Sequence, residues 1–422
     1  MKEYKNRVVD QVLMNKLEAK GAVLIEGPKW CGKTTTASQI AKSIVFMQDP
    51  ANSKQNLTMA EIQPSLLLKG ETPRLIDEWQ LAPQLWDAVR FEVDQRDAFG
   101  QFILTGSSVP AADMSNSHSG TGRISRMLMR PMTLHESGES NGSVSLQELF
   151  NNPKSFAVES PLGIEDLAFL ICRGGWPKAV GQTQRVALQQ AYDYYDSIVE
   201  SDISRSDGIS RNPQRVKNLM RSYSRFIASD AKIATIQADM VANDVDSLDY
   251  TTILSYINAL KRIFVIEDLP AWNPKLRSKS AIRQTDTRHF IDPSIAVGAL
   301  GIGPQDLLND LETMGLFFES LCVRDLRVFA EVLDGSVYHY RDKTNLECDA
   351  VIHLRNGNYG LVEVKLGGSA IDTAAGNLLK LQQKIDMQRM NQPSFLMVLS
   401  GTKFGYRRDD GVYVVPIGCL KE

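Results

Sequence analysis

The 422-residue chain has few cysteines and no long apolar run, and each absence excludes a class of protein. Its five cysteines are scattered and no two have C-x-x-C spacing, so the sequence predicts neither a disulfide framework nor a zinc site. No apolar segment approaches the length of a membrane span, and the charged start of the chain lacks the apolar core of a signal peptide. We therefore expect a reduced, cytoplasmic protein with no membrane partner.

The chain also lacks a strong charge of one sign and an internal repeat of fixed period. Its 47 Lys and Arg residues are balanced by 50 Asp and Glu residues, for a formal net charge of −3. A strongly basic nucleic-acid binder is therefore not indicated for the whole chain, although a local basic face stays open. The composition is that of a globular protein, and the length predicts roughly two to four domains.

Short apolar runs alternate with amphipathic segments in the first part of the chain. The runs 22–25, 75–76 and 102–104 are bounded by glycine or charge, which is typical of buried parallel strands. This alternation predicts an α/β layer as a first domain over residues 1–150. The Ser-, Gly- and Asn-rich run at 136–145 predicts a flexible surface loop near its end.

The pattern changes twice after residue 150. Apolar residues at three- and four-residue spacing predict a helical segment over 151–235. A helix over 250–262, a strand-like run, a basic hairpin and a second apolar run at 289–291 outline a winged helix within 236–305. A long helix followed by alternating strands and a further helix then predicts a second α/β domain over 306–422.

A phosphate-binding pattern directly follows the first predicted strand and opens a predicted helix. It fits G-x-x-x-x-G-K-[ST] and consists of Gly27, Pro28, Lys29, Trp30, Cys31, Gly32, Lys33 and Thr34. In such a loop the backbone N–H groups surround a phosphate, Lys33 reaches the β- and γ-phosphates, and the Thr34 hydroxyl coordinates Mg²⁺. We expect this loop, with the adjacent Thr35, to bind ATP together with Mg²⁺.

Two later strands end in polar residues that suit the same chemistry. Asp77 follows an apolar strand, where an aspartate can hold Mg²⁺, and the adjacent Glu78 can orient and activate the attacking water. After the strand at 102–104, Thr105 or Ser107 could hydrogen-bond the γ-phosphate or that water. The alternatives are a strand that ends in exposed acids for the first pair and an ordinary Ser/Gly turn for the second.

Two arginines in the basic run 120–126 are candidates for stabilising charge in the transition state. Arg123 and Arg126 could act as fingers, because the planar guanidinium matches phosphate geometry. Such a finger could come from the same chain or from a neighbouring subunit of a homo-oligomer. A solvated basic loop is the alternative.

In these residues the chain resembles a large group of bacterial and archaeal AAA-type ATPases whose C-terminal half carries a domain of unknown function. The resemblance implies an AAA-type P-loop core that binds ATP and hydrolyses it with Mg²⁺. It does not imply a cellular process. It also rests on the later runs Gly174-Gly175-Trp176-Pro177, Ser278-Lys279-Ser280 and Phe290-Ile291-Asp292-Pro293.

The C-terminal part carries a second constellation, in which Asp349, Glu363 and Lys365 have D-x₁₃-E-x-K spacing and Glu319 lies upstream on a predicted helix. This resembles the PD-(D/E)xK core of restriction-endonuclease-like folds. The resemblance implies a divalent metal at Asp349 and Glu363, and catalysis of phosphodiester cleavage with Glu319 and Lys365. A three-residue loop at 355–357 would place Asp349 opposite Glu363, whereas a two-residue turn would place it on the other face. A solvated charged hairpin, or an inactive domain that only binds, is the alternative.

Basic residues cluster in the middle of the chain and predict contact with DNA phosphates without base specificity. Arg211 and Arg215, like Arg221 and Arg225, are four residues apart, so each pair could line one face of a helix. Trp272 could stack on a base, although core packing or a domain contact explains it more simply. A solvated face is the alternative for the charges. The two clusters are Arg205, Arg211, Arg215, Lys217, Arg221, Arg225 and Lys232, and Lys275, Arg277, Lys279, Arg283 and Arg288.

Together these features predict a Mg-ATP-dependent ATPase that couples hydrolysis to action on DNA, and they leave metal-dependent DNA cleavage open. A second interpretation is a nucleotide-dependent switch that binds DNA or a protein partner and cleaves nothing.

Overall fold

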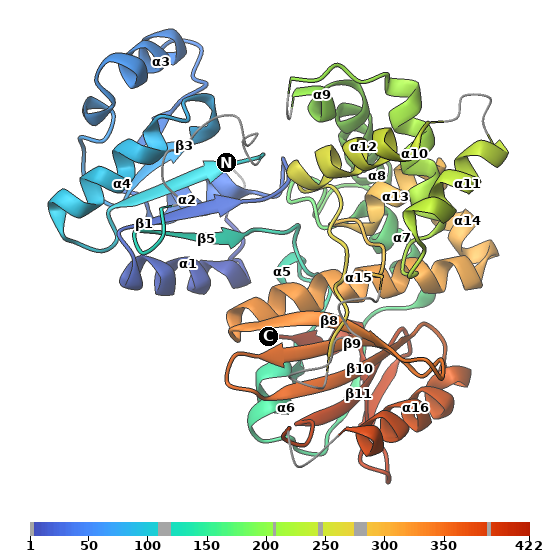
Figure 1. The fold of residues 1–422 in the computed structure, drawn as a ribbon. Coiled ribbons are helices and arrows are strands. Elements are labelled where there is room, and N and C mark those ends of the chain that lie inside the picture. Colours follow the sequence, from blue (N-terminus) through green and yellow to red (C-terminus); the bar gives the residue numbers. More distant parts are fainter. Residues whose placement is uncertain (1–3, 109–119, 206–207, 244–247, 274–284, 386–389) are drawn as a thin grey trace. The chain divides into compact units, whose positions relative to one another are not determined.

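In a computed structural model, the chain forms two compact units (Figure 1). The first comprises residues 1–131 with 200–211 and 258–265, and the second comprises the rest of the chain. Each unit contains its own β-sheet. The structure describes residues 4–108, 120–205, 208–243, 248–273, 285–385 and 390–422.

The first unit is an α/β layer around a five-stranded sheet whose neighbouring strands are all parallel, in the order β2-β3-β4-β1-β5. This confirms the α/β fold predicted from the alternation of apolar runs. The strands are β1 (Ala22–Glu26), β2 (Ser43–Phe46), β3 (Arg74–Asp77), β4 (Phe102–Gly106) and β5 (Ile124–Leu128). The helices are α1 (Val8–Ala19), α2 (Lys33–Ile40), α3 (Ser53–Ile62) and α4 (Leu85–Arg96), with the short α9 (Ile203–Arg205) later in the chain.

Apolar residues of the central strands form the core of this unit. Leu24 of β1 and Leu104 of β4 are fully buried in one cluster with Trp86 and Val89 of α4. Because β1, β3 and β4 are neighbours and parallel, their carboxyl ends meet at the same edge of the sheet. The residues that follow these three strands therefore lie close together.

The sequence analysis did not predict β2 and β5, which form the two edges of the sheet. Edge strands are not covered on all sides, so their apolar pattern is interrupted. In β5, for example, Ser125 and Arg126 separate the apolar Ile124 from Met127.

The second unit combines helices with a mixed seven-stranded sheet in the order β7-β12-β13-β11-β10-β9-β8. Within it, β10 pairs in parallel with β11 and antiparallel with β9. The strands are β7 (Ala157–Glu159), β8 (Gly335–Arg341), β9 (Glu347–Leu354), β10 (Tyr359–Lys365), β11 (Phe395–Ser400), β12 (Phe404–Arg407) and β13 (Tyr413–Pro416), and a small separate sheet joins β6 (Val144–Ser145) to β14 (Leu420–Lys421).

The helices α15 (Leu311–Val332) and α16 (Ile371–Lys384) pack against this sheet (Figure 1). Leu378 and Leu381 of α16 are buried with Val351, Leu361 and Val398 of the strands. The long helix and the strands predicted beyond residue 306 are therefore present. The helices of the unit are α5 (Leu134–Ser137), α6 (Leu146–Asn151), α7 (Ile164–Arg173), α8 (Gln184–Ser197), α10 (Pro213–Arg225), α11 (Ile233–Asn243), α12 (Tyr250–Arg262, which the division of the units crosses), α13 (Pro293–Leu300), α14 (Pro304–Asn309), α15 (Leu311–Val332) and α16 (Ile371–Lys384).

The surface loop predicted at 136–145 is limited to the irregular segment 138–143, and the rest of the range belongs to α5 and β6. Glu136 and Ser137 belong to α5 and are buried, and Ser140 is buried as well. The hydroxyl of Ser140 donates to the carbonyl oxygen of Leu420 at 2.7 Å. Composition favours a loop in this segment, but partners from the far end of the chain hold it. Residues 132–150, which the sequence analysis assigns to the first domain, lie in the second unit.

The winged helix stays a prediction. The helix expected at 250–262 is present as α12, but residues 263–265 form a turn and bend instead of the expected strand. Residues 274–284, the tip of the candidate wing, lie outside the described residues. In this region the described pairing consists of isolated antiparallel bridges of Ile266 with Phe290 and of Leu269 with Thr287.

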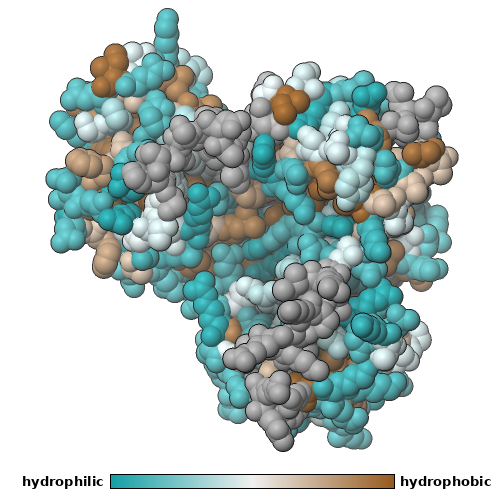
Figure 2. Space-filling view, in the orientation of Figure 1, coloured by the Kyte–Doolittle hydropathy of each residue, from teal (hydrophilic) through white to brown (hydrophobic). Residues whose placement is uncertain are grey.

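The visible surface is mostly hydrophilic, with apolar side chains in separate spots (Figure 2). Ile62, Phe91 and Phe99 are among the exposed large apolar residues of the first unit. Single exposed apolar residues are normal on a folded protein. Within the described ranges, no helix is long and apolar enough to cross a membrane.

Candidate functional site

The phosphate-binding pattern lies between β1 and α2 and has the backbone that such a loop needs. Gly27 and Gly32 both have positive φ angles, of 153° and 104°. A Cβ atom on Gly27 would lie 2.2 Å from the backbone oxygen of Met129, so glycine is required there. Gly32 directly precedes α2, so the loop leads into the amino end of that helix, where anions bind favourably.

Lys33 is buried at the start of α2, and the loop itself holds its ammonium group. Its Nζ donates to the backbone oxygens of Gly27 at 2.9 Å and Pro28 at 2.8 Å. The cation therefore lies within the loop that the pattern predicts to surround a phosphate. Trp30, at the tip of the loop, has a φ of 66° and remains 43% exposed.

The carboxylate of Asp77 is hydrogen-bonded to α2, which follows the P-loop, and to the end of β4. Its Oδ1 accepts hydrogen bonds from Thr34 Oγ1 at 2.6 Å and from Thr105 Oγ1 at 2.8 Å. The structure thus brings together the two residues predicted to hold Mg²⁺, and Thr105 with them. A hydroxyl and a carboxylate are oxygen donors of the kind that Mg²⁺ prefers, so these residues fit that ion.

Glu78 follows Asp77 with a φ of 56°, in the left-handed region. Its backbone N–H donates to Thr105 Oγ1 at 3.3 Å. Its carboxylate Oε2 accepts hydrogen bonds from Gln80 Nε2 and, at 3.1 Å, from Ser107 Oγ. Ser107, an alternative phosphate contact in the sequence analysis, therefore contacts Glu78, and Gln80 was not among the predicted site residues.

The structure does not bring Arg123 to the P-loop within one chain. The start of β5 pairs with the start of β1, so Arg123 lies at the opposite end of the sheet, about 17 Å along a strand of this length. Its Nε pairs with Asp94 at 2.7 Å, and Arg126 pairs with Glu26 at 3.1 Å. Arg123 therefore does not fit as a finger from the same chain. Arg126, whose partner Glu26 directly precedes Gly27, stays a prediction, as does a finger from a neighbouring subunit.

The second constellation lies on the paired strands β9 and β10. Of the two connections left open by the sequence, the structure has the three-residue loop at 355–357, because Ala350 pairs with Val362. One further step in the same register places Asp349 opposite Glu363. Both carboxylates therefore point to the same side of the hairpin.

Lys365 lies between these carboxylates, with its Nζ 3.0 Å from Asp349 Oδ2 and 2.8 Å from Glu363 Oε2. The N–H of Val364 also donates to Asp349 Oδ2 at 2.7 Å. Burial, followed by the charge of Asp349, raises the pKa of Glu363 and that of the nearby Glu319. Burial lowers the pKa of Lys365, but the two carboxylates outweigh this and raise it.

One oxygen of this cluster remains available to a ligand. Glu363 is only 2% exposed, and its Oε1 has no hydrogen-bond partner in the part of the chain that the structure describes. Two carboxylates with a buried, unused oxygen fit a divalent cation. Over the same residues, no group of three or more His, Cys, Asp or Glu side chains is arranged to hold a metal. A cation at Asp349 and Glu363 would therefore need water or backbone ligands as well.

Intramolecular contacts engage several of the basic residues predicted to contact DNA. Arg211 is buried and donates to backbone carbonyls, and it precedes α10, so it does not share a helical face with Arg215. Arg225 and Arg288 each pair with an aspartate. Lys275, Arg277, Lys279 and Arg283 lie outside the described residues, as does the side chain of Arg205.

Trp272 is a core residue rather than a platform for a base. It is 3% exposed and belongs to the cluster beneath α16. Its indole N–H donates to Nδ1 of His353 at 3.2 Å. Core packing, the simpler interpretation of this residue, is therefore confirmed.

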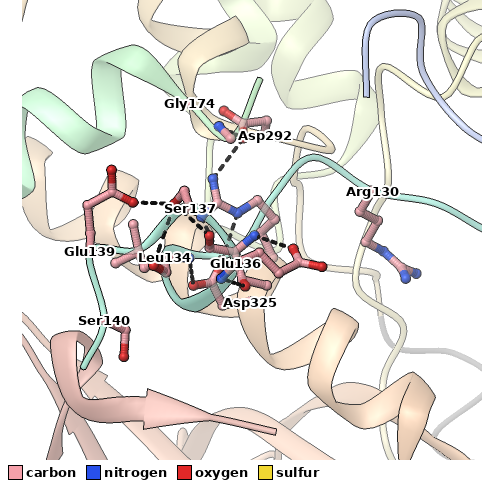
Figure 3. A network of polar contacts seen from close by, with 12 residues as sticks. Arg130, Leu134, Glu136, Ser137, Glu139, Ser140, Gly174, Asp292 and Asp325 are labelled. Atoms are coloured by element: carbon pink, nitrogen blue, oxygen red, sulfur yellow. Dashed lines mark hydrogen bonds and ion pairs between the residues drawn. The ribbon is translucent and has the colours of Figure 1, made fainter. Parts of the chain in front are cut away.

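A buried polar network in the second unit explains two of the later runs that carry the family resemblance (Figure 3). Arg324 of α15 donates to Asp292 Oδ2 at 2.8 Å and to Asp325 Oδ1 at 2.8 Å. The same Asp292 oxygen accepts the N–H of Gly175 at 2.9 Å, and Asp325 Oδ2 accepts that of Leu134 at 2.9 Å. The network therefore ties together four segments that are distant in sequence.

The two glycines before Trp176 are needed for this network. A Cβ atom on Gly174 would lie 2.4 Å from Ser294 Oγ, and one on Gly175 would lie 2.1 Å from the Met132 oxygen. The indole N–H of Trp176 donates to the same Ser294 hydroxyl at 2.9 Å. These runs therefore stabilise the fold of the unit. Arg324, which the sequence analysis missed, is marked only as a charge within a long apolar helix.

Comparison with protein families and relatives agrees with this geometry. Residues 19–138 match an AAA domain. The prediction of an AAA-type P-loop domain is therefore confirmed. Residues 164–306 and 314–420 match two domains of unknown function, DUF8612 and DUF4143, which leave the predicted nuclease-like fold untested.

Relatives of the chain do not add a function. Uncharacterized proteins of Mycobacterium tuberculosis and Mycobacterium bovis are each 24% identical over 359 residues, which is 84% of this chain and 72% of theirs. A Walker-type ATPase of Pyrococcus abyssi is 14% identical, and the match covers 70% of this chain and 96% of that one with a TM-score of 0.44. A likeness at that TM-score says nothing about function.

Proposed function

We propose that this protein binds Mg-ATP at the P-loop and hydrolyses it. The observation that carries the proposal is the meeting of three elements at Asp77, whose Oδ1 accepts hydrogen bonds from Thr34 of the P-loop helix and from Thr105 of β4. Side chains at the ends of adjacent parallel strands and a loop at a helix amino terminus together form a phosphate site. The match of this region to an AAA domain supports the same function.

Each residue has a distinct task in the proposed reaction. The loop N–H groups and Lys33 bind the phosphates, and Thr34 and Asp77 would hold Mg²⁺, which neutralises charge that develops on the phosphate oxygens. Glu78 orients the attacking water and accepts its proton. The water oxygen bonds to the γ-phosphorus while the bond to the ADP oxygen breaks, so the products are ADP and phosphate.

Glu78→Gln is expected to retain Mg-ATP binding but to slow hydrolysis by on the order of 10²-fold or more, because the amide cannot accept the proton of the water. Phosphate release at saturating ATP measures the rate, and isothermal titration calorimetry measures the affinity. Glu71→Gln, at an exposed position before β3, is the matched control and should behave as wild type. Unchanged turnover in Glu78→Gln would mean that another group orients the water.

A second candidate function is metal-dependent cleavage of DNA, favoured by the buried, unpartnered Oε1 of Glu363 beside Asp349 and Lys365. The two carboxylates would hold a divalent cation, and Lys365 would orient the attacking water. ATP hydrolysis would then be coupled to action on DNA. The alternative is a nucleotide-dependent switch that binds DNA or a protein partner without cleavage.

Supercoiled DNA incubated with the protein and Mg²⁺ or Mn²⁺ is expected to yield nicked and linear products, and linear DNA is expected to shorten. Glu363→Ala/Lys365→Ala should abolish these products, because it removes a metal ligand and the lysine at once. Glu165→Ala/Lys403→Ala, which removes two exposed charges of the same unit, serves as the control. Reactions with and without ATP show whether the nucleotide gates cleavage. Intact DNA in a preparation that still hydrolyses ATP would exclude cleavage and favour the switch.

A further inference from the structure

Two side chains hold the carboxylate of Glu78 by one of its oxygens. Oε2 accepts hydrogen bonds from Gln80 Nε2 and, at 3.1 Å, from Ser107 Oγ. Gln80 Nε2 is also 3.4 Å from Ser107 Oγ, so the three groups form a small closed cluster. Among the residues that the structure describes, Oε1 of Glu78 accepts no hydrogen bond. One oxygen is therefore fixed, and the other is left for a ligand.

The backbone on both strands is shaped to bring these groups together. Glu78 has a φ of 56°, and residues 79–81 continue as a 3₁₀ turn that carries Gln80 back towards it. On β4, Gly106 leaves room for this turn. A Cβ atom there would lie 2.9 Å from Gln80 Oε1 and 3.0 Å from Trp79 Nε1.

Among the described residues, the side chain of Gln80 has no polar contact beyond Glu78 and Ser107. Its Oε1 is buried and accepts no hydrogen bond from any described residue. Buried amide oxygens are normally hydrogen-bonded, so this arrangement is unfavourable for stability alone. Ser107 is also buried, and its hydroxyl donates to Glu78. The polar groups of both residues therefore act mainly through the carboxylate of Glu78.

We propose that Gln80 and Ser107 are positioning residues that aim Oε1 of Glu78 at the attacking water, an inference that rests on the proposed ATP hydrolysis. A general base is effective only within hydrogen-bond reach of the proton that it accepts. Donors on Oε2 stop rotation of the carboxylate without occupying the oxygen that reacts. The proton moves from the water to Oε1 while the water oxygen bonds to the γ-phosphorus and the ADP oxygen departs with its electron pair.

A double-mutant cycle tests this role by asking whether Gln80 acts through Glu78. Turnover of ATP and the Kd for Mg-ATP are measured for wild type, Gln80→Ala, Glu78→Gln and the double variant. Gln80→Ala is expected to lower kcat about tenfold, because small misplacements of a reacting group are costly, with KM and Kd unchanged. In the Glu78→Gln background the same change should alter kcat by less than about twofold. Gln84→Ala, at an exposed position before α4, is the matched control.

Two substitutions of Ser107 extend the test. Ser107→Ala is expected to lower kcat only where Glu78 is present, and Ser107→Thr, which keeps the hydroxyl, should restore most of the rate. Unfolding midpoints are measured for every variant. A purely structural role would lower kcat equally in both Glu78 backgrounds or would lower the midpoint together with kcat.

The outcomes separate this inference from the proposed hydrolysis. Wild-type kcat in Gln80→Ala, or an equal loss in both Glu78 backgrounds, would overturn the positioning role and leave ATP hydrolysis standing. Wild-type protein that releases no phosphate from bound Mg-ATP would overturn the hydrolysis and the positioning role together. A loss of kcat in Gln80→Ala that occurs only when Glu78 is present would support both the positioning role and ATP hydrolysis.

Discussion

Lys33→Ala is expected to abolish ATP hydrolysis and to weaken nucleotide binding. The Lys33 ammonium group lies within the P-loop, where it donates to the backbone oxygens of Gly27 and Pro28. In the bound state it would donate to the β- and γ-phosphates instead. Hydrogen bonds between charged groups contribute about 1.5–3 kcal/mol, so the Kd should rise roughly 10- to 100-fold. The loss of turnover should be larger, because charge on the phosphate oxygens develops further in the transition state.

Phosphate release and calorimetric titration with Mg-ATP measure the two effects. Lys42→Ala removes an exposed lysine just after α2 and should change neither quantity. Equal unfolding midpoints for the two variants would show that the substitution leaves the fold intact. Normal turnover in Lys33→Ala would exclude the P-loop as the site of hydrolysis.

Arg324→Met is expected to destabilise the second unit by about 3–5 kcal/mol, the range found when one partner of a buried ion pair is removed. Arg324 is 2% exposed and lies between Asp292 and Asp325, which are also buried. Methionine keeps much of the volume of the side chain but leaves two carboxylates without their cation. Urea-induced unfolding of the full chain measures the loss.

The pH dependence of this loss has a definite sign. Burial already raises the pKa of Asp325 to about 6 in the presence of Arg324. Without the arginine, Asp325 should take up a proton in the folded state at higher pH than in the unfolded chain. A raised folded-state pKa of an acid means that stability falls as pH rises, so the deficit of Arg324→Met should shrink on acidification.

A surface ion pair supplies the control for this second prediction. Arg408 contacts Asp372, which is 88% exposed, so Arg408→Met should cost about 0–1 kcal/mol. If Arg324→Met destabilised the protein no more than Arg408→Met, the buried network would not hold the second unit together.

The candidate ATP site could be predicted because its residues directly follow strands. The P-loop is one continuous run, and Asp77 and Thr105 each come at the end of an apolar strand. The carboxyl ends of parallel strands share one edge, so their proximity follows from the fold class. The contact of Gln80 with Glu78 did not follow, because it needs a left-handed backbone at a glutamate, where no glycine or asparagine signals it.

The arginine candidates show what a local pattern leaves undecided. Arg123 and Arg126 suit phosphate chemistry by residue type, but β5 starts beside the start of β1, which places Arg123 away from the P-loop. The sequence marks β5 weakly, because it is an edge strand with an interrupted apolar pattern. Without the strand, the register that separates Arg123 from the loop could not be inferred.

Local spacing in the sequence determined the P-loop, the α/β alternation of the first unit and the presence of Asp349, Glu363 and Lys365 on one hairpin. Tertiary structure alone decided the three-residue loop that sets Asp349 opposite Glu363, the pairing of 144–145 with the C-terminal strand, and the burial of Arg324 between two aspartates. The physical reason is that turns, strands and helices follow from neighbouring residues, whereas ladder hydrogen bonds and buried ion pairs join residues far apart in the chain. No local pattern specifies which distant partner will satisfy a buried polar group.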